Sequence, residues 1–318
     1  ILAGGTDLVG LLKRRIVAPD RVVDITSIPE LQQIYVGDDR SVSIGATVHL
    51  DEFMEHPTTH AYPAIKQIIA GISSIQLQCQ GTFVGELLRR PHCWYFRDGH
   101  GLLADRGQLV QSGDNRYHAI LGNRGPAKFT HASRVAPALI ALGAKVRIVG
   151  PGAADEQFVD VAALYQIPKR EGELEHTLSP GQWVTHVILP PDTGELSAAY
   201  EVRHGEGPDM PLASAAVHLD VRYGIVRAAR IVLGQVAPVP WLALRAVDSL
   251  VGQPLTVLAA EQAGVEAVAE ATPLSHNAHK IDLARVAVKR AILRAGGLDT
   301  GGHPLPNLPP HAANRQLA

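Results

Sequence analysis

Two glycine-bearing segments carry the residue types and the spacing that could bind a phosphate. The first reads AGGTDL, in which Gly4 and Gly5 follow an apolar triplet and precede a helical spacing of leucines. Unpaired backbone N–H groups at such a turn point outward, and glycine lets an anion approach the backbone closely. On spacing alone a structural turn is the favoured interpretation and a phosphate site is the alternative, because one Gly-Gly step is shorter than a dinucleotide fingerprint.

The second segment, CQGTFVGELLRRPHCWYFR at residues 79–97, combines Gly81, Thr82 and Gly85 with three arginines and an aromatic run. An aromatic anchor beneath a loop with solvated arginines explains this segment when it is taken by itself. Two such loops in one domain would instead hold the two phosphates of a dinucleotide between them. The residues leave both interpretations open at this point.

Other catalytic chemistry finds little support among the side chains. The chain has 15 histidines, but no pair shows metal-ligand spacing with a supporting carboxylate. Neither cysteine stands in a known active-site string, and no Gly-x-Ser-x-Gly motif occurs. We therefore expect no catalytic side chain and no metal ligand, and any redox chemistry would belong to a cofactor.

Composition indicates a folded protein of about two domains, with 46% hydrophobic and 19% charged residues among 318. A formal net charge of -2 gives no general attraction to nucleic acid or to an anionic membrane. No run approaches the roughly 20 apolar residues of a membrane span. Two cysteines, Cys79 and Cys93, favour a reducing compartment, so we expect a cytoplasmic protein, with periplasmic export of a whole complex through a partner subunit as the alternative.

The first 26 residues follow a strand, glycine turn, helix, strand order that favours parallel strands joined by a crossover helix. Residues 81–123 are rich in Gly, Arg and His without a clear period, which predicts loops. Apolar periodicity predicts the remaining elements of this half of the chain. They are strands at residues 41–46 and 144–150 and helices at residues 50–55, 62–71 and 133–142.

A domain boundary is expected between Tyr165 and Gln182, because this stretch is polar and contains proline and glycine without an apolar period. Beyond it, strands followed by three helices predict an α+β module with a small antiparallel sheet. Two of the strands form a hairpin at residues 222–224. The predicted elements are strands at residues 183–189, 198–203, 212–221 and 225–234 and helices at residues 241–251, 257–270 and 280–295.

With these residues in view, the sequence resembles the flavin-binding medium subunit of the molybdenum hydroxylases, the family of xanthine dehydrogenase and carbon monoxide dehydrogenase. It is most similar to the bacterial aldehyde oxidoreductase branch. The resemblance covers nearly all of residues 1–297. It is carried by ILAGGTDLVGLLK, VSIGATVHLDEF, YPAIKQII, GTFVGELLRRPHCWYFRD, NRYHAILG, HASRVAPALIALGAKVRIVG, PLASAAVHL, VLGQVAPVPWLA and NAHKIDLARVAVKRAIL.

The resemblance implies an α+β fold in two domains followed by a tail. Residues 1–168 would form an FAD-binding domain of the molybdopterin dehydrogenase type with two subdomains, a small parallel sheet and a mixed sheet with helices. Residues 169–297 would form the flavoprotein C-terminal domain, an antiparallel sheet with three helices, and residues 298–318 an extended tail. Family members normally have another strand and helix ahead of the position of Ile1, which implies a truncated start.

The resemblance also implies a cofactor and partners. Electrons would pass from a molybdenum-cofactor large subunit, where substrate is oxidised, to a [2Fe-2S] small subunit, then to FAD and finally to NAD or another acceptor. The FAD pyrophosphate would be held mainly by backbone N–H groups of two loops. These are Ala3, Gly4, Gly5, Thr6, Asp7 and Leu8 in the first loop and Gly81, Thr82 and Gly85 in the second.

Three positions depart from the family pattern at the flavin site. The second loop usually reads Thr-x-Gly-Gly-Asn, and here Val84 and Glu86 replace a glycine and the asparagine. Valine is poorly suited to positive φ, and a carboxylate would repel phosphate. Arg134 replaces an aspartate that in the family can reach the ribityl chain of the flavin. These departures support the alternative of a degenerate scaffold subunit that keeps the fold and its partners but has lost FAD.

The aldehyde oxidoreductase branch also carries a [4Fe-4S] cluster in the loop that follows CWYFRD. Cys93 matches its first ligand, but no further cysteine follows it in this chain. The loss of three of four ligands predicts that no [4Fe-4S] cluster is bound. The loop, with Arg106, remains a candidate docking surface.

Overall fold

The computed structural model describes residues 1–152, 154–205 and 209–301 of the chain. It contains two antiparallel sheets packed with helices, so the α+β class that the sequence predicts is confirmed. Of the tail expected from residue 298, the part from residue 302 onward lies outside the described residues.

The first sheet has five strands. They are β1 (Ile34–Val36), β2 (Val42–Gly45), β3 (Lys145–Val149), β4 (Glu156–Asp160) and β5 (Trp183–Leu189). Their order across the sheet is β1-β2-β5-β3-β4, and every neighbouring pair is antiparallel. The inner strands β2 and β5 are almost entirely buried, whereas the edge strand β4 is mostly exposed and polar, which suits an edge that must not pair further.

The small parallel sheet expected at the start of the chain is reduced to one pair of residues. Leu2 forms a parallel bridge with Asp24, in which the N–H of Leu2 donates to Val23. Of Ile1, Leu2 and Ala3, which precede the paired glycines, only Leu2 forms a bridge within the described chain. The mixed sheet expected in the FAD-binding domain corresponds to the five-stranded first sheet. It is antiparallel, because short turns join β1 to β2 and β3 to β4 and allow only that direction.

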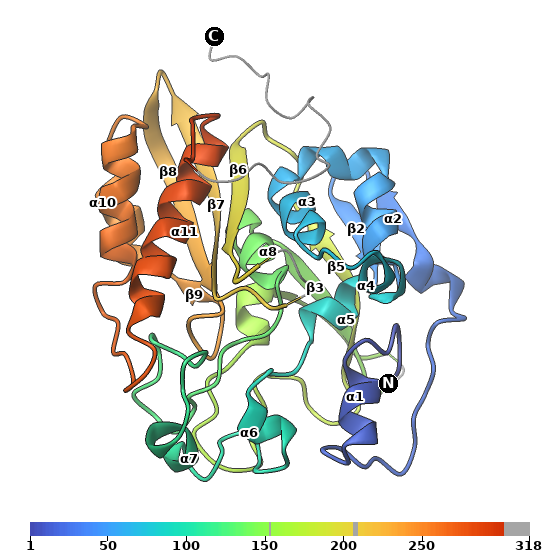
Figure 1. Ribbon diagram of the computed structural model, residues 1–318. Coiled ribbons are helices and arrows are strands. Elements are labelled where there is room, and N and C mark those ends of the chain that lie inside the picture. The colour runs from blue at the N-terminus through green and yellow to red at the C-terminus, as the bar shows by residue number, and fades with distance from the viewer. Residues whose placement is uncertain (153, 206–208, 302–318) are drawn as a thin grey trace.

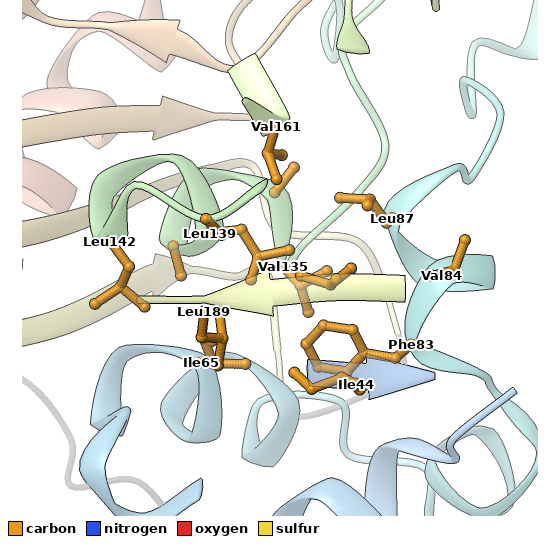
Figure 2. Close-up of a cluster of buried hydrophobic side chains, with 14 of the residues drawn as sticks. Ile44, Ile65, Phe83, Val84, Leu87, Val135, Leu139, Leu142, Val161 and Leu189 are labelled. Atoms are coloured by element: carbon orange, nitrogen blue, oxygen red, sulfur yellow. The ribbon is translucent and has the colours of Figure 1, made fainter. Parts of the chain in front are cut away.

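Helices cover the first sheet and fill its core. They are α2 (Leu50–Glu55), α3 (Pro63–Ala70), α4 (Ile75–Gln80), α5 (Phe83–Leu87) and α8 (Ala136–Leu142). In Figure 2, Leu139 and Leu142 of α8 lie on one side of β5 and Ile65 of α3 on the other. The rings of Phe53 and Phe83 stack with centroids 4.9 Å apart and join α2 to α5. Helix α4 was not predicted, because its apolar residues show no helical spacing and none of them is buried.

The second sheet is the antiparallel module that the sequence predicts. Its strands are β6 (Leu196–Val202), β7 (Ala213–Arg222), β8 (Ile225–Gly234) and β9 (Trp241–Leu242), and its helices are α9 (Leu244–Leu250), α10 (Val257–Ala267) and α11 (His279–Ala295). The turn between β7 and β8 has positive φ at Tyr223 and Gly224, the geometry that matches the twist of a two-residue hairpin. Figure 1 shows α11 lying across this sheet with α10 beside it.

The change from one sheet to the other differs in position from the domain boundary expected near residue 168. Strand β5 pairs with β2 and β3, so residues 183–189 belong to the first sheet rather than to the second domain. The chain passes to the second sheet between Leu189 and Leu196. Sequence pattern placed the boundary too early because the polar stretch before β5 is a long loop of the first domain.

Helix α8 joins the two sheets. All of its residues are buried, and it packs against β7 and β8 as well as against the core of the first sheet (Figure 1). Two further hydrogen bonds join α3 to the region of β6: the N–H of Ala199 donates to Gln67 Oε1 at 2.7 Å, and Arg203 donates to the carbonyl of Gly71 at 2.6 Å. The two domains therefore share a continuous interior.

The loop-rich region contains only short helices among its described residues, as the sequence predicts. Buried polar groups hold it in place: the Lys280 ammonium donates to the carbonyl oxygens of Tyr117, His118 and Gln235 at 3.0, 3.2 and 2.7 Å. The remaining short elements are α1 (Leu8–Lys13), α6 (Trp94–Arg97), α7 (Gln108–Ser112), η1 (Pro29–Gln32), η2 (Pro57–Ala61) and η3 (Val161–Leu164).

Candidate functional site

A cavity of about 490 Å³ lies where the first loop, the start of α5 and the segment before β5 meet. Every predicted residue of the first loop, from Ala3 to Leu8, lines it, and so do Thr82 and Gly85 of the second loop. Leu174, His176 and residues 178–184 also line it. The structure therefore brings together around one cavity all of the predicted site residues except Gly81.

The two positions of the first loop that hold glycine require it for different structural reasons. Gly5 has a φ of +70°, a conformation that other residues adopt only with strain. A Cβ atom on Gly4 would overlap the carbonyl oxygen of Gln80 at the end of α4. The Gln80 side chain donates to the carbonyl of Gly4 at 3.0 Å, so the first loop and α4 are held in close contact.

The first loop presents a run of unpaired donors. None of the backbone N–H groups of residues 3–8 donates a hydrogen bond within the part of the chain that the structure describes. The residues that carry them are half-buried and all line the cavity. Half-buried N–H groups need a partner, and successive ones form a concavity suited to an anion. This arrangement favours the phosphate site over the simple turn.

The second loop is positioned by its contact with the first sheet. The N–H of Phe83 donates to the carbonyl of Val48 at 2.8 Å, which fixes the start of α5 beside the end of β2. Gly85 lies close under Thr82, where an added Cβ would stand 2.6 Å from the Thr82 hydroxyl. Gly81 instead ends α4: its N–H donates to Leu77 at 2.8 Å and it does not line the cavity.

Asp7 ties the first loop to the segment that follows the second. Its carboxylate accepts from the Arg97 guanidinium at 2.8 Å and from the backbone N–H of Arg90 at 2.9 Å. The guanidinium of Arg97 also donates to the carbonyls of Pro91 and Arg90, both at 2.8 Å. The charge of Asp7 is thus compensated, and the residue can contribute its backbone N–H to an anion without repelling it.

The replacements at positions 84 and 86 do not obstruct the cavity in the way that the sequence suggests. Val84 lies inside α5 and is not among the residues with positive φ, so no left-handed conformation is required of it. Glu86 is buried and does not line the cavity. Its carboxylate accepts from Arg89 at 2.9 Å and from the backbone N–H of Arg134 at 3.1 Å.

Arg134 also lies outside the cavity. Its guanidinium is 2% exposed and forms a bidentate ion pair with Glu201 of β6, with one of the two bonds at 2.8 Å. The cation that replaces the family's aspartate therefore links the first domain to the second sheet. Glu86 and Arg134 are thus held in the interior, and Val84 lines the cavity with an uncharged side chain, so none of the three departures places a charge at the cavity.

Two parts of the site were missed by the sequence reasoning. Leu174, His176 and residues 178–182, which form part of a wall of the cavity, lie in the polar stretch where a domain boundary was expected. Arg90 lines the cavity, although the sequence alone did not distinguish it from the neighbouring arginines. Only the pairing of β5 with β2, which is not visible in a local pattern, brings the wall to the two loops.

Cys93 does not fit a cluster ligand. Its buried Sγ lies 3.1 Å from His118 Nε2, and the only other cysteine of the chain, Cys79, is exposed on α4. Burial raises the pKa of the Cys93 thiol to about 11, which disfavours the thiolate that iron requires. Within the described residues, no group of three or more His, Cys, Asp or Glu side chains is arranged to bind a metal ion.

Two sequence families match the chain in the order of its two sheets. The family described as the FAD binding domain in molybdopterin dehydrogenase matches residues 1–192, and the CO dehydrogenase flavoprotein C-terminal domain matches residues 198–295. The chain therefore belongs to the FAD-binding subunits of the molybdenum hydroxylase and carbon monoxide dehydrogenase family, as the resemblance predicts. Proteins of this kind are oxidoreductase subunits.

Curated relatives cover almost the whole chain. The aldehyde oxidoreductase FAD-binding subunit PaoB of Escherichia coli is 29% identical over 305 residues, which are 92% of this chain and 90% of the relative. The carbon monoxide dehydrogenase medium chain of Afipia carboxidovorans is 27% identical over 92% of this chain and 88% of its own length.

Solved structures show the same fold. The Cu,Mo-CO dehydrogenase in its cyanide-inactivated form matches with a TM-score of 0.69 and 25% identity over 92% of this chain and 88% of that chain. Quinoline 2-oxidoreductase from Pseudomonas putida 86 matches with a TM-score of 0.67 and 23% identity over the same shares. Among the described helices, none combines the length and the apolar character that a membrane span needs.

Proposed function

We propose that this chain is the electron-transfer subunit of a molybdenum-containing hydroxylase or aldehyde oxidoreductase complex. It holds FAD in the cavity between the two loops and so connects the [2Fe-2S] clusters of a partner subunit to an external acceptor. The observation that carries the proposal is the run of unpaired N–H groups at residues 3–8 beside Thr82 and Gly85. The family membership of the chain supports the same reading.

Each part of the site has a separate task in this proposal. Bound FAD supplies the redox chemistry, and the chain supplies binding, orientation and protection from water. The N–H groups from Ala3 to Leu8 bind the pyrophosphate, and Thr82 and Gly85 close the opposite side. Leu174, His176 and residues 178–184, which line the cavity, limit the entry of water. Gly81 acts indirectly by ending α4, which supports Gly4.

The partners follow from the family. The named relatives belong to aldehyde oxidoreductase and carbon monoxide dehydrogenase, which supports a molybdenum-cofactor large subunit and a [2Fe-2S] small subunit as partners of this chain. NAD or another acceptor would then receive the electrons. Two free cysteines support a reducing compartment, the cytoplasm, for the chain itself.

The test is the flavin content of the complex purified from its own operon or by co-expression. We expect a visible absorption band of oxidised flavin at about 450 nm and release of FAD on denaturation, at one FAD per copy of this chain. Iron analysis should give no iron beyond that of the partner's [2Fe-2S] clusters. A well-folded complex without flavin would support the scaffold subunit instead and contradict the proposal.

A further inference from the structure

The cavity has very few charged side chains. Among its described lining residues Arg90 is the only arginine or lysine, and Asp7 is the only acidic residue. Asp7 is already paired with Arg97 at 2.8 Å. Arg90 is therefore the side chain best placed to compensate the negative charge of an anionic ligand in this cavity.

Three contacts hold Arg90 in place, two of them at its guanidinium. Its Nε donates to Glu175, its carbon Cζ lies 5.0 Å from the centroid of the Phe96 ring, and its backbone N–H is bonded to Asp7. The side chain is 20% exposed. A guanidinium that is already stacked and bonded loses little conformational entropy when it binds a ligand.

The contacts leave the outer edge of the guanidinium available. Within the described chain, neither Nη group of Arg90 donates a hydrogen bond, and neither belongs to the buried atoms that lack a partner, so both are accessible to solvent. The planar fork of two Nη groups matches two oxygens of a phosphate. Arg90 lines the same cavity as residues 3–8 of the first loop, to which its backbone N–H is bonded through Asp7.

We infer that Arg90 binds the pyrophosphate of FAD through its two Nη groups and makes the site select FAD over flavins that lack a pyrophosphate. The inference rests on the proposed function. In this arrangement the first loop supplies neutral donors, and Arg90 supplies the permanent positive charge that a diphosphate needs in a half-buried site. Glu175 is the anchor of Arg90 and has no contact with the cavity of its own.

The test must separate the charge of Arg90 from the stability of its pair with Glu175. Glu175 is 4% exposed, and its second carboxylate oxygen is buried without a partner among the described residues, so Arg90→Gln alone would strand a buried charge and could unfold the chain. The matched pair is therefore Glu175→Gln and Arg90→Gln/Glu175→Gln, which differ only at position 90. Both are prepared as the full chain without flavin, and flavin fluorescence gives the dissociation constants of FAD and riboflavin.

The double variant should bind FAD about 10- to 100-fold more weakly than Glu175→Gln, the range expected for a hydrogen bond between charged groups. Its affinity for riboflavin, which has no phosphate, should stay within about 3-fold. The FAD dissociation constant of Glu175→Gln should rise with salt more steeply than that of the double variant. Replacing Arg90 by Lys in the Glu175→Gln background should restore part of the lost affinity, because Lys keeps the charge but not the fork.

The outcomes distinguish the inference from the proposed function. If the wild-type chain binds neither flavin, both are overturned. If the wild type binds FAD and the double variant binds it as tightly as Glu175→Gln, only the role of Arg90 is overturned. An equal loss of FAD and riboflavin would also overturn it, because a structural effect would not discriminate between the two ligands.

Discussion

The glycines in and after the first loop differ in the constraint that requires a residue without a side chain. Gly4 is required by the approach of Gln80, whereas Gly5 is required by its own positive φ of +70°. Gly10, the third residue of α1, has neither constraint, and no described atom lies within 4 Å of an added Cβ. Gly5 and Gly10 therefore form a natural pair for testing the loop geometry.

Gly5→Ala should lower the free energy of unfolding by about 1–2 kcal/mol, because an L residue is strained at this φ. The strain is relieved by rotating the peptide, so FAD affinity should fall as well. Gly10→Ala should keep FAD affinity and stabilise the chain by up to about 1 kcal/mol, because alanine favours a helix. Urea unfolding and FAD titration of both variants check this, and equal FAD affinities would show that the loop backbone does not hold the ligand.

Buried histidines give the chain a defined sensitivity to acid. Burial lowers the pKa of His131 to about 3, and burial together with the Lys280 ammonium lowers the pKa of His118 to about 4. Below about pH 6.5 the unfolded chain binds protons that the folded chain does not. The free energy of unfolding should therefore decrease as pH falls from about 6.5 towards 4, by at most about 1.4 kcal/mol per pH unit for each histidine.

His131→Phe isolates this effect. The imidazole packs edge-on against Tyr165 with centroids 4.4 Å apart, and its buried Nδ1 has no partner within the described chain, so a phenyl ring can replace it. Urea unfolding should show similar stability at neutral pH and a smaller loss at about pH 5 than in the wild type. The exposed His60, replaced by Gln, is the control and should leave the pH dependence unchanged. If His131→Phe loses as much stability at acidic pH as the wild type does, His131 is not a cause of the sensitivity to acid.

Residue types predicted the glycine turn of the first loop, because Gly4 and Gly5 are neighbours and stand shortly before α1; its binding of FAD stays a prediction. They predicted Val84, Glu86 and Arg134 poorly. The sequence interpretation compared each of them with a phosphate site, whereas Glu86 accepts from its near neighbour Arg89 and from the N–H of Arg134. Arg134 in turn pairs with Glu201, which only the folded chain brings close.

At the scale of elements, the buried network of Glu86, Arg134 and Glu201 connects α5, the start of α8 and β6. Arg134→Met should lower the free energy of unfolding by about 3–5 kcal/mol, because it leaves buried carboxylates without their cation. Adding Glu201→Gln should recover part of the loss. Arg245→Met, which removes the more exposed pair with Glu266, should cost no more than about 1 kcal/mol.

Urea unfolding of these variants is the measurement. If Arg134→Met and Arg245→Met lower the free energy of unfolding equally, the buried network stabilises the contact between the domains no more than an exposed ion pair would. A double variant less stable than Arg134→Met alone would contradict the view that stranded charge is the cause of the loss. Arg134→Asp, which restores the family residue, should lower the free energy of unfolding more than Arg134→Met does, because it would place three carboxylates together in the interior.

Elements whose partners are close in sequence could be predicted, and those with distant partners could not. The β7–β8 hairpin follows from alternation on both sides of Tyr223 and Gly224, and α11 follows from its helical period. Strand β5 was recognised as a strand but placed in the wrong sheet, because its neighbours are β2 and β3. For the same reason, the part of the cavity wall that precedes β5 was not predicted.

On the scale of the whole molecule, the two sheets should unfold as one unit. Helix α8 is buried between them, and the core of the first sheet includes Ala216 and Val232 from β7 and β8. FAD binds only at the first domain in our proposal, yet the shared interior would let it stabilise both. A ligand at 100 times its dissociation constant adds about 2.7 kcal/mol to the free energy of unfolding.

Thermal unfolding of the full chain should therefore show a single transition that rises by about 4 °C with FAD at that concentration, given the unfolding entropy typical of a chain of this size. Tryptophan fluorescence and far-UV circular dichroism should give the same midpoint, because the shared core leaves no stable intermediate. Riboflavin serves as the control and should raise the midpoint less. Two transitions, of which only one moves with FAD, would show that the second sheet is stable on its own and that α8 does not couple the domains.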